Sequence, residues 1–417
     1  MDYHARSLAL VDEIERAYPV TQWQVGDVPV WPLARLILHG NLYKQNEQSV
    51  ASAEEKAHRP RRASLAASYA LSPLIDAWQR RSDLRHTVLV PRRANAVYLG
   101  NGDAFDQIDG AWQDRFGDPV IAELRKSGRS TFLMQYGDIW RHLPWQRPTF
   151  SANTIMKWGA LSAAGLGLAR RLPSHLPDYD LVQQFLRQAD VPLSGLAPMD
   201  LRKAAAATAA TARRFERVLK IVRPSLCFIL GYFSKIGFAL SLACRRQGIL
   251  SIEVQHGGCG ARNESYCWSA VPEHGYTVLP SVFWTWTEGD TAVIEAWSRK
   301  LKSPWHRGIQ GGHPQLPVWF DDNDPQTRSF DARINEIRAG SPAEREILVA
   351  LQANEGYRDL WNELAALIER APSNWRWWLR HRQNTRGAER QLGRLFALRR
   401  PNVLIEEASL LPLPALL

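Results

Sequence analysis

Residues 224–258 read PSLCFILGYFSKIGFALSLACRRQGILSIEVQHGG, and this stretch predicts a complete strand–helix–strand unit. The apolar run 225–232 suits a strand that is buried on both faces. Ser234 is a candidate N-cap for the helix that follows, and Gly248 can adopt the left-handed conformation that ends a helix. The extended pattern resumes at 249–254. The stretch therefore predicts two parallel strands joined by a helix.

The tripeptide Gln255-His256-Gly257 closes this unit, so it is expected at the carboxyl end of a strand. Open α/β sheets bind their ligands beyond that end. A histidine there can act as a general base, because its ordinary pKa near 6.5 leaves much of it neutral at cytoplasmic pH. Gly257 and Gly258 would permit close approach of a ligand. The alternative is that His256 merely hydrogen-bonds a neighbouring loop.

Length, charge and cysteine content set the broad class. The chain has 417 residues, 45% of them hydrophobic, which is enough for two or more globular domains. Its 52 basic and 42 acidic residues give a formal charge of +10, which suits nucleic acid, an anionic membrane or a phosphate-bearing substrate. The four cysteines have no CxxC spacing, so we expect reduced thiols in the cytoplasm.

Membrane attachment is a separate question. The N-terminus has no signal-peptide pattern, and the longest weakly polar run, 158–169, falls short of the roughly twenty residues that a spanning helix needs. Apolar helical stretches are nevertheless flanked by basic residues, which would permit peripheral attachment to the inner face of the cytoplasmic membrane. A solvated helix face is the alternative. The basic residues are Arg59, Arg61, Arg62, Arg80, Arg81, Arg170 and Arg171.

The hydrophobic pattern predicts an N-terminal α/β domain at 1–310 that begins with mainly helical residues. Its expected elements before residue 224 are strands at 87–91 and 131–136, a helix at 118–126 and a helical insertion at about 155–222. Asp200 is a candidate N-cap in the insertion. Such an insertion often shapes a substrate site.

A linker rich in Gly, Pro and Asp is predicted at 311–342, and a second α/β domain at 343–417. The strands expected in that domain are 346–351, 375–379 and 403–406. Three strands are few for a doubly wound unit, so we expect the second domain to be incomplete at its C-terminus.

Four short motifs follow one another along the chain. They are VQHGG at 254–258, PEHGY at 272–276, LPSVFWTW at 279–286 and GGHP at 311–314. Their order resembles that of bacterial surface-polysaccharide glycosyltransferases of the two-domain GT-B type, and WPLAR at 31–35 is similar to an N-terminal element of those proteins. The resemblance implies two Rossmann-like domains that face a cleft, with the acceptor held mainly by the first and a nucleotide-activated sugar mainly by the second.

On this resemblance His256 is the expected base, and Gln255, Gly257, Gly258, His274 and Tyr276 are expected to bind substrate. A packed loop is the simpler explanation for His274 and Tyr276. The resemblance also suggests donor contacts from the GGHP segment at 311–314 and from the residues that follow the predicted strand 375–379. The alternative for the first is a plain interdomain turn, and the alternative for the second is a solvated loop. The donor candidates are Gly311, Gly312, His313, Arg380 and His381.

The chain also departs from the family pattern. At 379–382 it reads LRHR, where such proteins often carry an Arg-x-His-Pro-like turn. The family's donor-binding Ser/Thr and Glu elements would lie beyond residue 417, so they cannot be transferred to this sequence.

Asp103, Asp106 and Asp109 suggest a calcium loop, but their spacing is wrong and a glutamate at the twelfth position is missing. We predict no metal and no cofactor. Asp103 or Asp106 could instead contact the acceptor and compete with His256 as base. The arginines and tryptophans of 375–400 suggest nucleic acid, but the tryptophans fall in a predicted strand, so they are expected in the core.

These observations predict a glycosyltransferase that passes a sugar from a nucleotide-activated donor to a surface polysaccharide, such as capsule or lipopolysaccharide, or to a lipid-linked glycan. Two alternatives remain open. One is a polyol-phosphate transferase of the CDP-glycerol kind, and the other is a non-catalytic glycan-binding protein that has lost its donor site. The sequence leaves the donor, the acceptor, the linkage and the oligomeric state undetermined.

Overall fold

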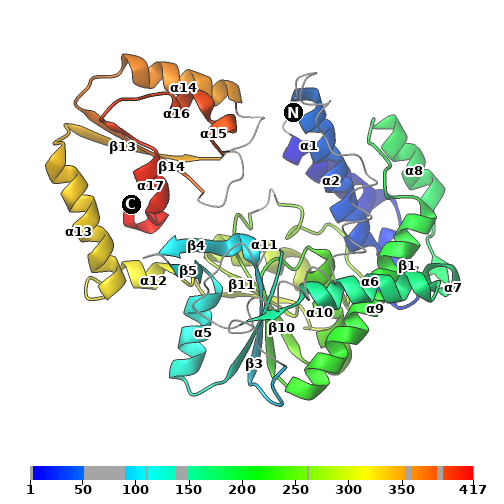
Figure 1. Cartoon of the computed structure of the whole chain (residues 1–417). Coiled ribbons are helices and arrows are strands. Elements are labelled where there is room, and N and C mark those ends of the chain that lie inside the picture. Colours follow the sequence, from blue (N-terminus) through cyan, green and yellow to red (C-terminus); the bar gives the residue numbers. More distant parts are fainter. Residues whose placement is uncertain are drawn as a thin grey trace.

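The protein consists of two α/β parts, each built on a parallel sheet (Figure 1). This arrangement confirms the predicted α/β class. The computed structural model describes residues 3–50, 90–108, 111–137, 149–260, 263–352, 358–382 and 388–416.

The first sheet has seven parallel strands in the order β12-β11-β10-β9-β3-β6-β7. The chain starts in the middle at β3 and adds β6 and β7 on one side. It then returns beside β3 to add β9, β10, β11 and β12 on the other side, so the winding direction reverses between β3 and β9. Ligands of doubly wound sheets bind at such a switch point. The strands are β3 (Ala96–Asn101), β6 (Thr131–Tyr136), β7 (Phe150–Ser151), β9 (Leu226–Ile229), β10 (Leu250–Val254), β11 (Val282–Thr285) and β12 (Arg307–Gln310).

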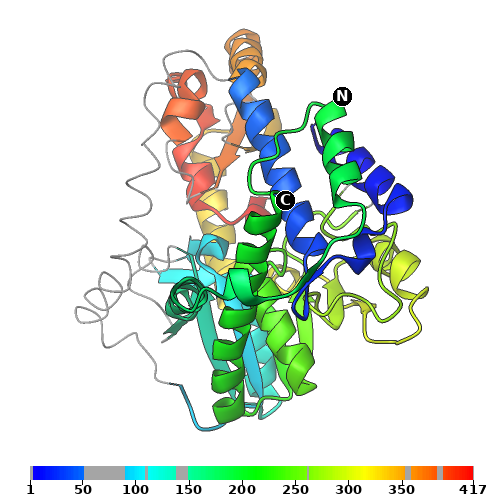
Figure 2. The same cartoon turned by 90° about the vertical axis from the view of Figure 1, so that its right-hand side faces the viewer.

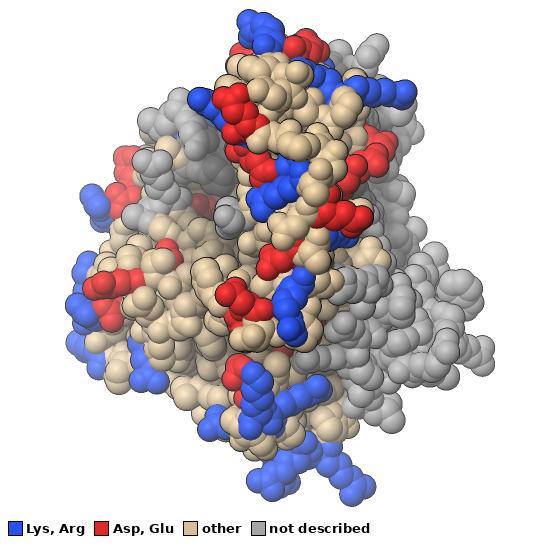
Figure 3. Space-filling model, turned by 90° about the vertical axis from the view of Figure 1, so that its left-hand side faces the viewer, with Lys and Arg blue, Asp and Glu red and all other residues tan. Residues whose placement is uncertain are grey.

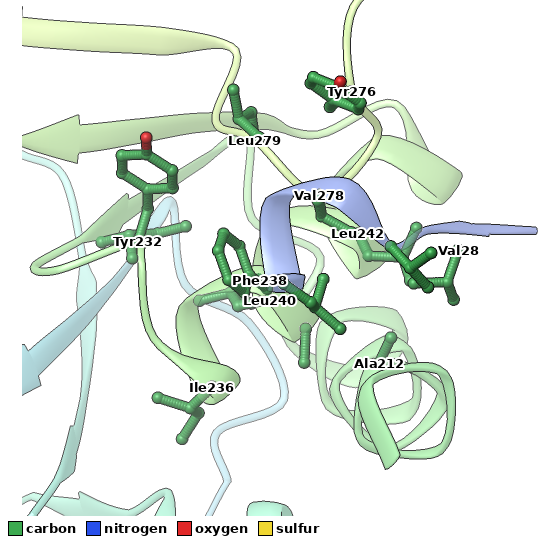
Figure 4. Packing of buried hydrophobic residues seen from close by; sticks show 14 of the residues in the cluster. Val28, Ala212, Tyr232, Ile236, Phe238, Leu240, Leu242, Tyr276, Val278 and Leu279 are labelled. Atoms are coloured by element: carbon green, nitrogen blue, oxygen red, sulfur yellow. The ribbon is translucent and has the colours of Figure 1, made fainter. Parts of the chain in front are cut away.

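The unit predicted at 224–258 is confirmed as β9, α10 (Lys235–Gln247) and β10. Ser234 caps the helix, since its Oγ accepts a hydrogen bond of 3.1 Å from the Gly237 amide. Gly248 ends it at φ 66°. Figure 4 shows how the helix is held: Leu240 and Leu242 pack with Val28 and Val278 in the main core.

The start of the first sheet differs from the prediction. Residues 87–89 of the predicted strand 87–91 lie outside the described residues, and Val90 and Pro91 are not in a strand. The first strand is β3, which the sequence analysis missed. The predicted helix at 118–126 and strand at 131–136 are confirmed as α5 (Gly117–Lys126) and β6. Between β3 and α5 lie η3 (Gly102–Ala104) and a hairpin of β4 (Phe105–Ile108) and β5 (Ala111–Asp114).

Helices cover one side of the first sheet (Figure 2). The predicted helical insertion contains α6 (Asn153–Gly165), α7 (Leu168–Arg171), α8 (Tyr179–Gln188) and α9 (Pro198–Val222). Asp200 is not the N-cap: Ala197 holds that position, and Asp200 lies in the first turn of α9. The N-terminal elements are α1 (Tyr3–Ala17), η1 (Val20–Gln22), β1 (Gln24–Val25), β2 (Val28–Pro29) and α2 (Trp31–Val50), and β8 (Ser174–His175) pairs with β1.

The second sheet has the order β13-β14-β15, and its predicted strands are confirmed as β13 (Arg345–Leu351), β14 (Trp375–His381) and β15 (Val403–Leu404). The segment predicted as a linker contains two helices, and Asp324 caps the longer one through the Gln326 amide at 2.8 Å. The remaining elements are α11 (Glu288–Ser298), α12 (Leu316–Trp319), α13 (Pro325–Gly340), α14 (Arg358–Arg370), α15 (Ala388–Gln391), α16 (Gly393–Phe396), α17 (Glu406–Leu410) and η6 (Leu413–Leu416).

Both α2 and the second sheet stand over the end of the first sheet at which β3 runs into β4 (Figure 1). That is the carboxyl end, where His256 follows β10. Arg382 follows β14 and is close enough to His256 for its charge to lower the pKa of that histidine. The carboxyl ends of the two sheets therefore face each other. Within the described residues, no helix is both long and apolar enough to cross a membrane.

Candidate functional site

A row of aromatic rings lines the carboxyl end of the first sheet. Four neighbouring strands, β9 to β12, are each followed by an aromatic side chain: Phe233, His256, Trp286 and His313. His256 stacks on Phe233 with ring centroids 5.5 Å apart, and Trp286 lies 4.5 Å from His313. Phe116 joins the two pairs at 6.3 Å from His256 and 6.4 Å from Trp286. Adjacent parallel strands end side by side, which brings these distant residues together.

Glu253 and His256 form a buried acid–histidine pair. The Glu253 side chain is 1% exposed, and its Oε1 lies 3.4 Å from His256 Nδ1. The Val254 carbonyl oxygen lies 3.3 Å from the same nitrogen. Two acceptors at Nδ1 favour the tautomer with the proton on that atom, which leaves Nε2 as the acceptor. This is the arrangement in which a carboxylate orients a catalytic imidazole.

Other groups fix the Glu253 carboxylate in place. Its Oε2 accepts a hydrogen bond of 2.9 Å from the Tyr232 amide, and its Oε1 accepts one of 3.2 Å from the Tyr266 hydroxyl. Burial lowers the pKa of His256, but the hydrogen bond and charge of Glu253 outweigh burial, so the pKa is raised above its ordinary value. The imidazolium that forms when His256 takes up a proton is thus stabilised.

The switch point lies beside the imidazole. Gly231 follows β9 with φ 81°, and a Cβ added there would lie 3.9 Å from His256 Nε2 and 3.1 Å from the Tyr136 hydroxyl. Any larger residue would be strained by this φ. Its Cβ would also occupy the space in van der Waals contact with Nε2. Gly231 therefore keeps space open for a substrate at the nitrogen that is able to accept a proton.

A cavity of about 550 Å³ adjoins the row at Phe233. Aromatic walls come from Tyr232, Phe233, Phe238 and Trp268, and polar groups come from the 258–265 loop and α2. The positive charge of Arg35 is already used, because its Nη1 lies 3.0 Å from Glu15 Oε1 and its guanidinium stacks on Trp268. Aromatic faces with a few polar groups are typical of sites for neutral, ring-shaped ligands.

Positive charge gathers where the two sheets face each other. Burial lowers the pKa of Arg380, and the positive charges of Arg115 and Arg382 lower it further, whereas Asp106 raises it. Arg115 Nε lies 3.4 Å from Asp106 Oδ2. Arg115 and Arg380 therefore both interact with the Asp106 carboxylate, and the charge of Arg382 acts on both Arg380 and His256. A diphosphate would relieve the mutual repulsion of these arginines.

The residues of the Gln-His-Gly motif have two distinct roles in the structure. Gln255 is 2% exposed and braces the loop: its Nε2 donates to the Gly257 carbonyl at 2.9 Å, and its Oε1 accepts from the Trp286 amide at 2.7 Å. Gly257 and Gly258 are exposed, and the described residues leave open space around a Cβ at either position. The motif thus combines a rigid support with room for a ligand beside His256.

The GGHP loop differs from the expectation of amides free for an anion. The amides of Gly311 and Gly312 both donate to the Thr285 carbonyl, at 2.9 and 3.1 Å. A Cβ on Gly311 would lie 2.2 Å from Trp284 Nε1, so close packing explains that glycine. His313 does join the aromatic row. Burial lowers its pKa, as does the nearby charge of Arg115.

The other predicted residues occupy varied positions. Tyr276 is buried in the main core, where it packs 5.1 Å from Trp268, and His274 is exposed on its own loop; neither joins the aromatic row. Asp106 is buried beside Arg115. The side chain of Asp103, Asp109, and the basic residues at 59–81 lie outside the described residues.

The two donor candidates at the end of β14, Arg380 and His381, already make contacts within their own part of the molecule. Arg380 is buried, and its Nε donates to the Leu411 carbonyl at 2.9 Å, so it supports the C-terminal end of α17. The His381 ring lies 5.6 Å from Phe396, and its amide donates to Ser409 Oγ. In the described structure His381 therefore contacts its own part of the molecule.

Sequence reasoning missed Glu253, Phe116 and Trp286. Glu253 left a signal, because it is an acid inside the short, otherwise mostly apolar strand at 249–254. Phe116 left none. Its position in the row depends on the hairpin, where Asp114 Oδ1 accepts from the amides of Phe116 and Gly117 at 3.1 and 2.9 Å.

No cluster of three or more His, Cys, Asp or Glu side chains that could hold a metal ion occurs in the described part of the chain. No protein-family profile matches the sequence, and no curated protein does. Among solved structures, the chain is similar to the UDP-GlcNAc 2-epimerase from Neisseria meningitidis bound to UDP-GlcNAc, with 14% identity, a TM-score of 0.40, and coverage of 75% of this chain and 71% of the other. A putative UDP-N-acetylglucosamine 2-epimerase from Listeria monocytogenes gives 11% identity, a TM-score of 0.39, and coverage of 75% and 68%. Similarity at this level assigns no activity to the chain.

Proposed function

We propose that this protein is a glycosyltransferase that uses a nucleotide-activated sugar, with His256 as its general base. The observation that carries the proposal is the Glu253–His256 pair at the carboxyl end of a parallel sheet, beside both an aromatic-walled cavity and a group of arginines. The resemblance of the Gln-His-Gly motif and its neighbours to surface-polysaccharide glycosyltransferases supports the same reaction class.

In this proposal a neutral acceptor glycan occupies the cavity between α2 and the 258–268 loop, and its rings stack on Phe233 and Trp268. His256 Nε2 takes the proton of the acceptor hydroxyl. The hydroxyl oxygen then forms a bond to the anomeric carbon of the donor, and the bond from that carbon to the diphosphate breaks. Glu253 stabilises the imidazolium that results.

The donor lies between the two sheets, with its diphosphate near Arg115, Arg380 and Arg382. Positive charge held there by the fold would stabilise the leaving nucleoside diphosphate as its negative charge develops. Trp286 and His313 offer ring faces on the same side of His256. We further propose that the acceptor is part of a surface polysaccharide or a lipid-linked glycan, as the resemblance implies.

Nucleotide release from a panel of UDP-, GDP-, dTDP- and CMP-sugars, with and without oligosaccharide acceptors, tests the proposal. We expect His256→Ala to lower turnover by about 10²-fold or more, because general-base catalysis contributes roughly that factor. His274→Ala is the matched control, since that exposed histidine stands apart from the aromatic row, and it should retain wild-type turnover. A folded His256→Ala protein with full activity would remove the base assignment.

The same experiment separates the two alternatives. CDP-glycerol belongs in the panel, because a polyol-phosphate transferase would release CMP from it and leave the sugar nucleotides intact. Glycan binding by calorimetry without turnover of any donor would instead favour a non-catalytic glycan-binding protein.

A further inference from the structure

Helix α6 exposes an apolar face to solvent. Trp158, Leu161 and Leu166 at its outer side are 46%, 43% and 55% exposed, and Ala160 and Ala164 between them are exposed as well. The opposite side of the helix packs on α9, where a Cβ on Gly159 would lie 2.2 Å from Thr211 Oγ1. A surface helix of a soluble protein normally carries polar residues on its outer side. The outer side of this helix is instead largely apolar.

The chain that forms this face carries basic residues and no acidic ones, although the neighbouring α9 contains Glu216, whose Oε1 pairs with Arg246 Nη1 at 2.7 Å. Between Asp138 and Asp178 the chain contains no aspartate or glutamate. Lys157 lies on α6 and the exposed Arg170 and Arg171 follow in α7. From α9, Arg214 lies 5.9 Å from the Trp158 ring and donates to Ser162 Oγ at 2.7 Å, with Arg213 and Arg217 beside it in sequence.

Within the described residues, helix α14 is another helix with exposed leucines, but it lacks this combination. Helix α14 also exposes two leucines, Leu360 and Leu367, both 51% exposed, but it carries Asp359, Glu363 and Glu369 along its length. On the face shown in Figure 3, acidic and basic side chains are interspersed. The stretch 139–177, which includes α6 and α7, therefore combines exposed apolar side chains with basic residues and no acidic ones.

We propose that α6 and α7 form an interfacial docking surface for an anionic lipid bilayer. Tryptophan and leucine on one side of a helix bury in the headgroup region, and lysine and arginine beside them are attracted to anionic lipids. A second copy of the chain fits less well, because a symmetric contact would bring the same basic residues against each other.

Vesicle flotation tests this surface without reference to catalysis. The whole protein should float with vesicles of 70% phosphatidylcholine and 30% phosphatidylglycerol in low salt, bind less to pure phosphatidylcholine, and be released as salt rises. The triple variant Trp158→Ser, Leu161→Gln, Leu166→Gln should lose at least tenfold in vesicle affinity. Arg170→Gln with Arg171→Gln should lose severalfold and flatten the salt dependence.

Matched controls use exposed residues elsewhere. Leu360→Gln with Leu367→Gln removes two equally exposed leucines, and Arg328→Gln with Arg333→Gln removes two exposed arginines of α13. Both control proteins should bind as the wild type does. Circular dichroism verifies that each variant is folded, and hydrogen exchange should show protection of 153–171 when vesicles are added.

Three results would overturn the proposal: equal binding to neutral and anionic vesicles, wild-type binding by the folded α6 variant, or protection of a segment other than 153–171. A fourth is a dimer by light scattering that the α6 variant dissociates while vesicle binding persists. That result would identify a second copy of the chain as the occupant of this face.

Discussion

The carboxyl ends of the two sheets carry opposite kinds of chemistry. In the first sheet, aromatic rings follow β9 to β12, and Glu253 near the end of β10 pairs with His256. In β14 of the second sheet, by contrast, arginines occur within the strand itself. Arg376 and Arg380 are both buried, and each donates to a backbone carbonyl at the C-terminal end of a helix, α13 and α17 respectively.

These two buried arginines differ in where their charge is compensated. Arg376 forms an ion pair with Glu346 of the neighbouring strand β13. The acid that raises the pKa of Arg380 is Asp106, which belongs to the hairpin of the first part. Arg376 is therefore a structural arginine of its own sheet, whereas the charge of Arg380 acts across the gap between the two parts. In the proposed mechanism, the first part would thus provide the base, the ring faces and Arg115, and the second part would provide Arg380 and Arg382.

The largest effect is expected from removing the charge of Glu253, the acid of the Glu253–His256 pair in the first part. Glu253→Gln keeps the shape but removes the charge that raises the pKa of His256. We expect turnover to fall by roughly 10- to 10³-fold, because the imidazole loses its orientation and its stabilised imidazolium. The pKa of His256 should fall as well, so the acidic limb of the pH–activity profile should move to lower pH.

The pH profile separates positioning from mere loss of structure. Tyr266→Phe is the matched control, because it removes one hydrogen bond to the same carboxylate and leaves its charge. That variant should keep an acidic limb close to that of the wild type. A Glu253→Gln protein whose profile coincides with the wild-type profile would show that Glu253 does not tune His256.

Arg382, an exposed arginine, tests whether the second part contributes positive charge to donor binding. Arg382→Gln removes a charge near His256 and Arg380 without opening a buried site. We expect the KM for the nucleotide-activated donor to rise about tenfold with kcat less affected, because a charge-assisted hydrogen bond to phosphate contributes about 1.5–3 kcal/mol. Arg394→Gln, which removes an exposed arginine paired with Glu369, should change neither constant. Equal effects from both variants would show that the charge near the cleft has no special role.

The smallest expected effect is on stability. Its pH dependence should have opposite signs for one carboxyl group of the first part, Asp114, and one of the second part, Glu346. In the first part, burial and the nearby Asp118 raise the pKa of Asp114 to about 7. A carboxyl group with a raised pKa in the folded state contributes full stability below its unfolded pKa and loses it as pH rises through the folded value. Asp114→Asn should therefore gain Tm relative to the wild type between about pH 4 and pH 7.

Glu346 of the second part should behave oppositely. Burial raises its pKa, but Arg338 and Arg376 outweigh burial, so the pKa is lowered. Its contribution is present above the unfolded pKa and is lost as pH falls through the folded value. Glu346→Gln should thus lower the Tm at pH 7 and have little effect in strong acid. Calorimetry of both variants across pH 3–8 checks this, and two difference curves with the same slope would contradict it.

The sequence by itself determined the elements whose signals are local. The 224–258 unit was predictable with its cap at Ser234 and its stop at Gly248, because an N-cap hydroxyl and a left-handed glycine act within a few residues. The same holds for α5, β6 and the three strands of the second sheet. The position of His256 at the end of a strand followed from this local pattern.

What the tertiary structure decided depends on contacts between residues far apart in the chain. β3 was missed in the sequence analysis, and its place is set by pairing with β6 and β9. Trp286 and His313 meet because parallel strands end side by side, and Phe116 joins them from the hairpin before α5. Arg380 and Asp106 interact because two sheets face each other. A periodicity reports which face of an element is buried, but it carries no information about which distant element covers that face. The histidine could therefore be read from the sequence, whereas the acid, rings and charges around it required the fold.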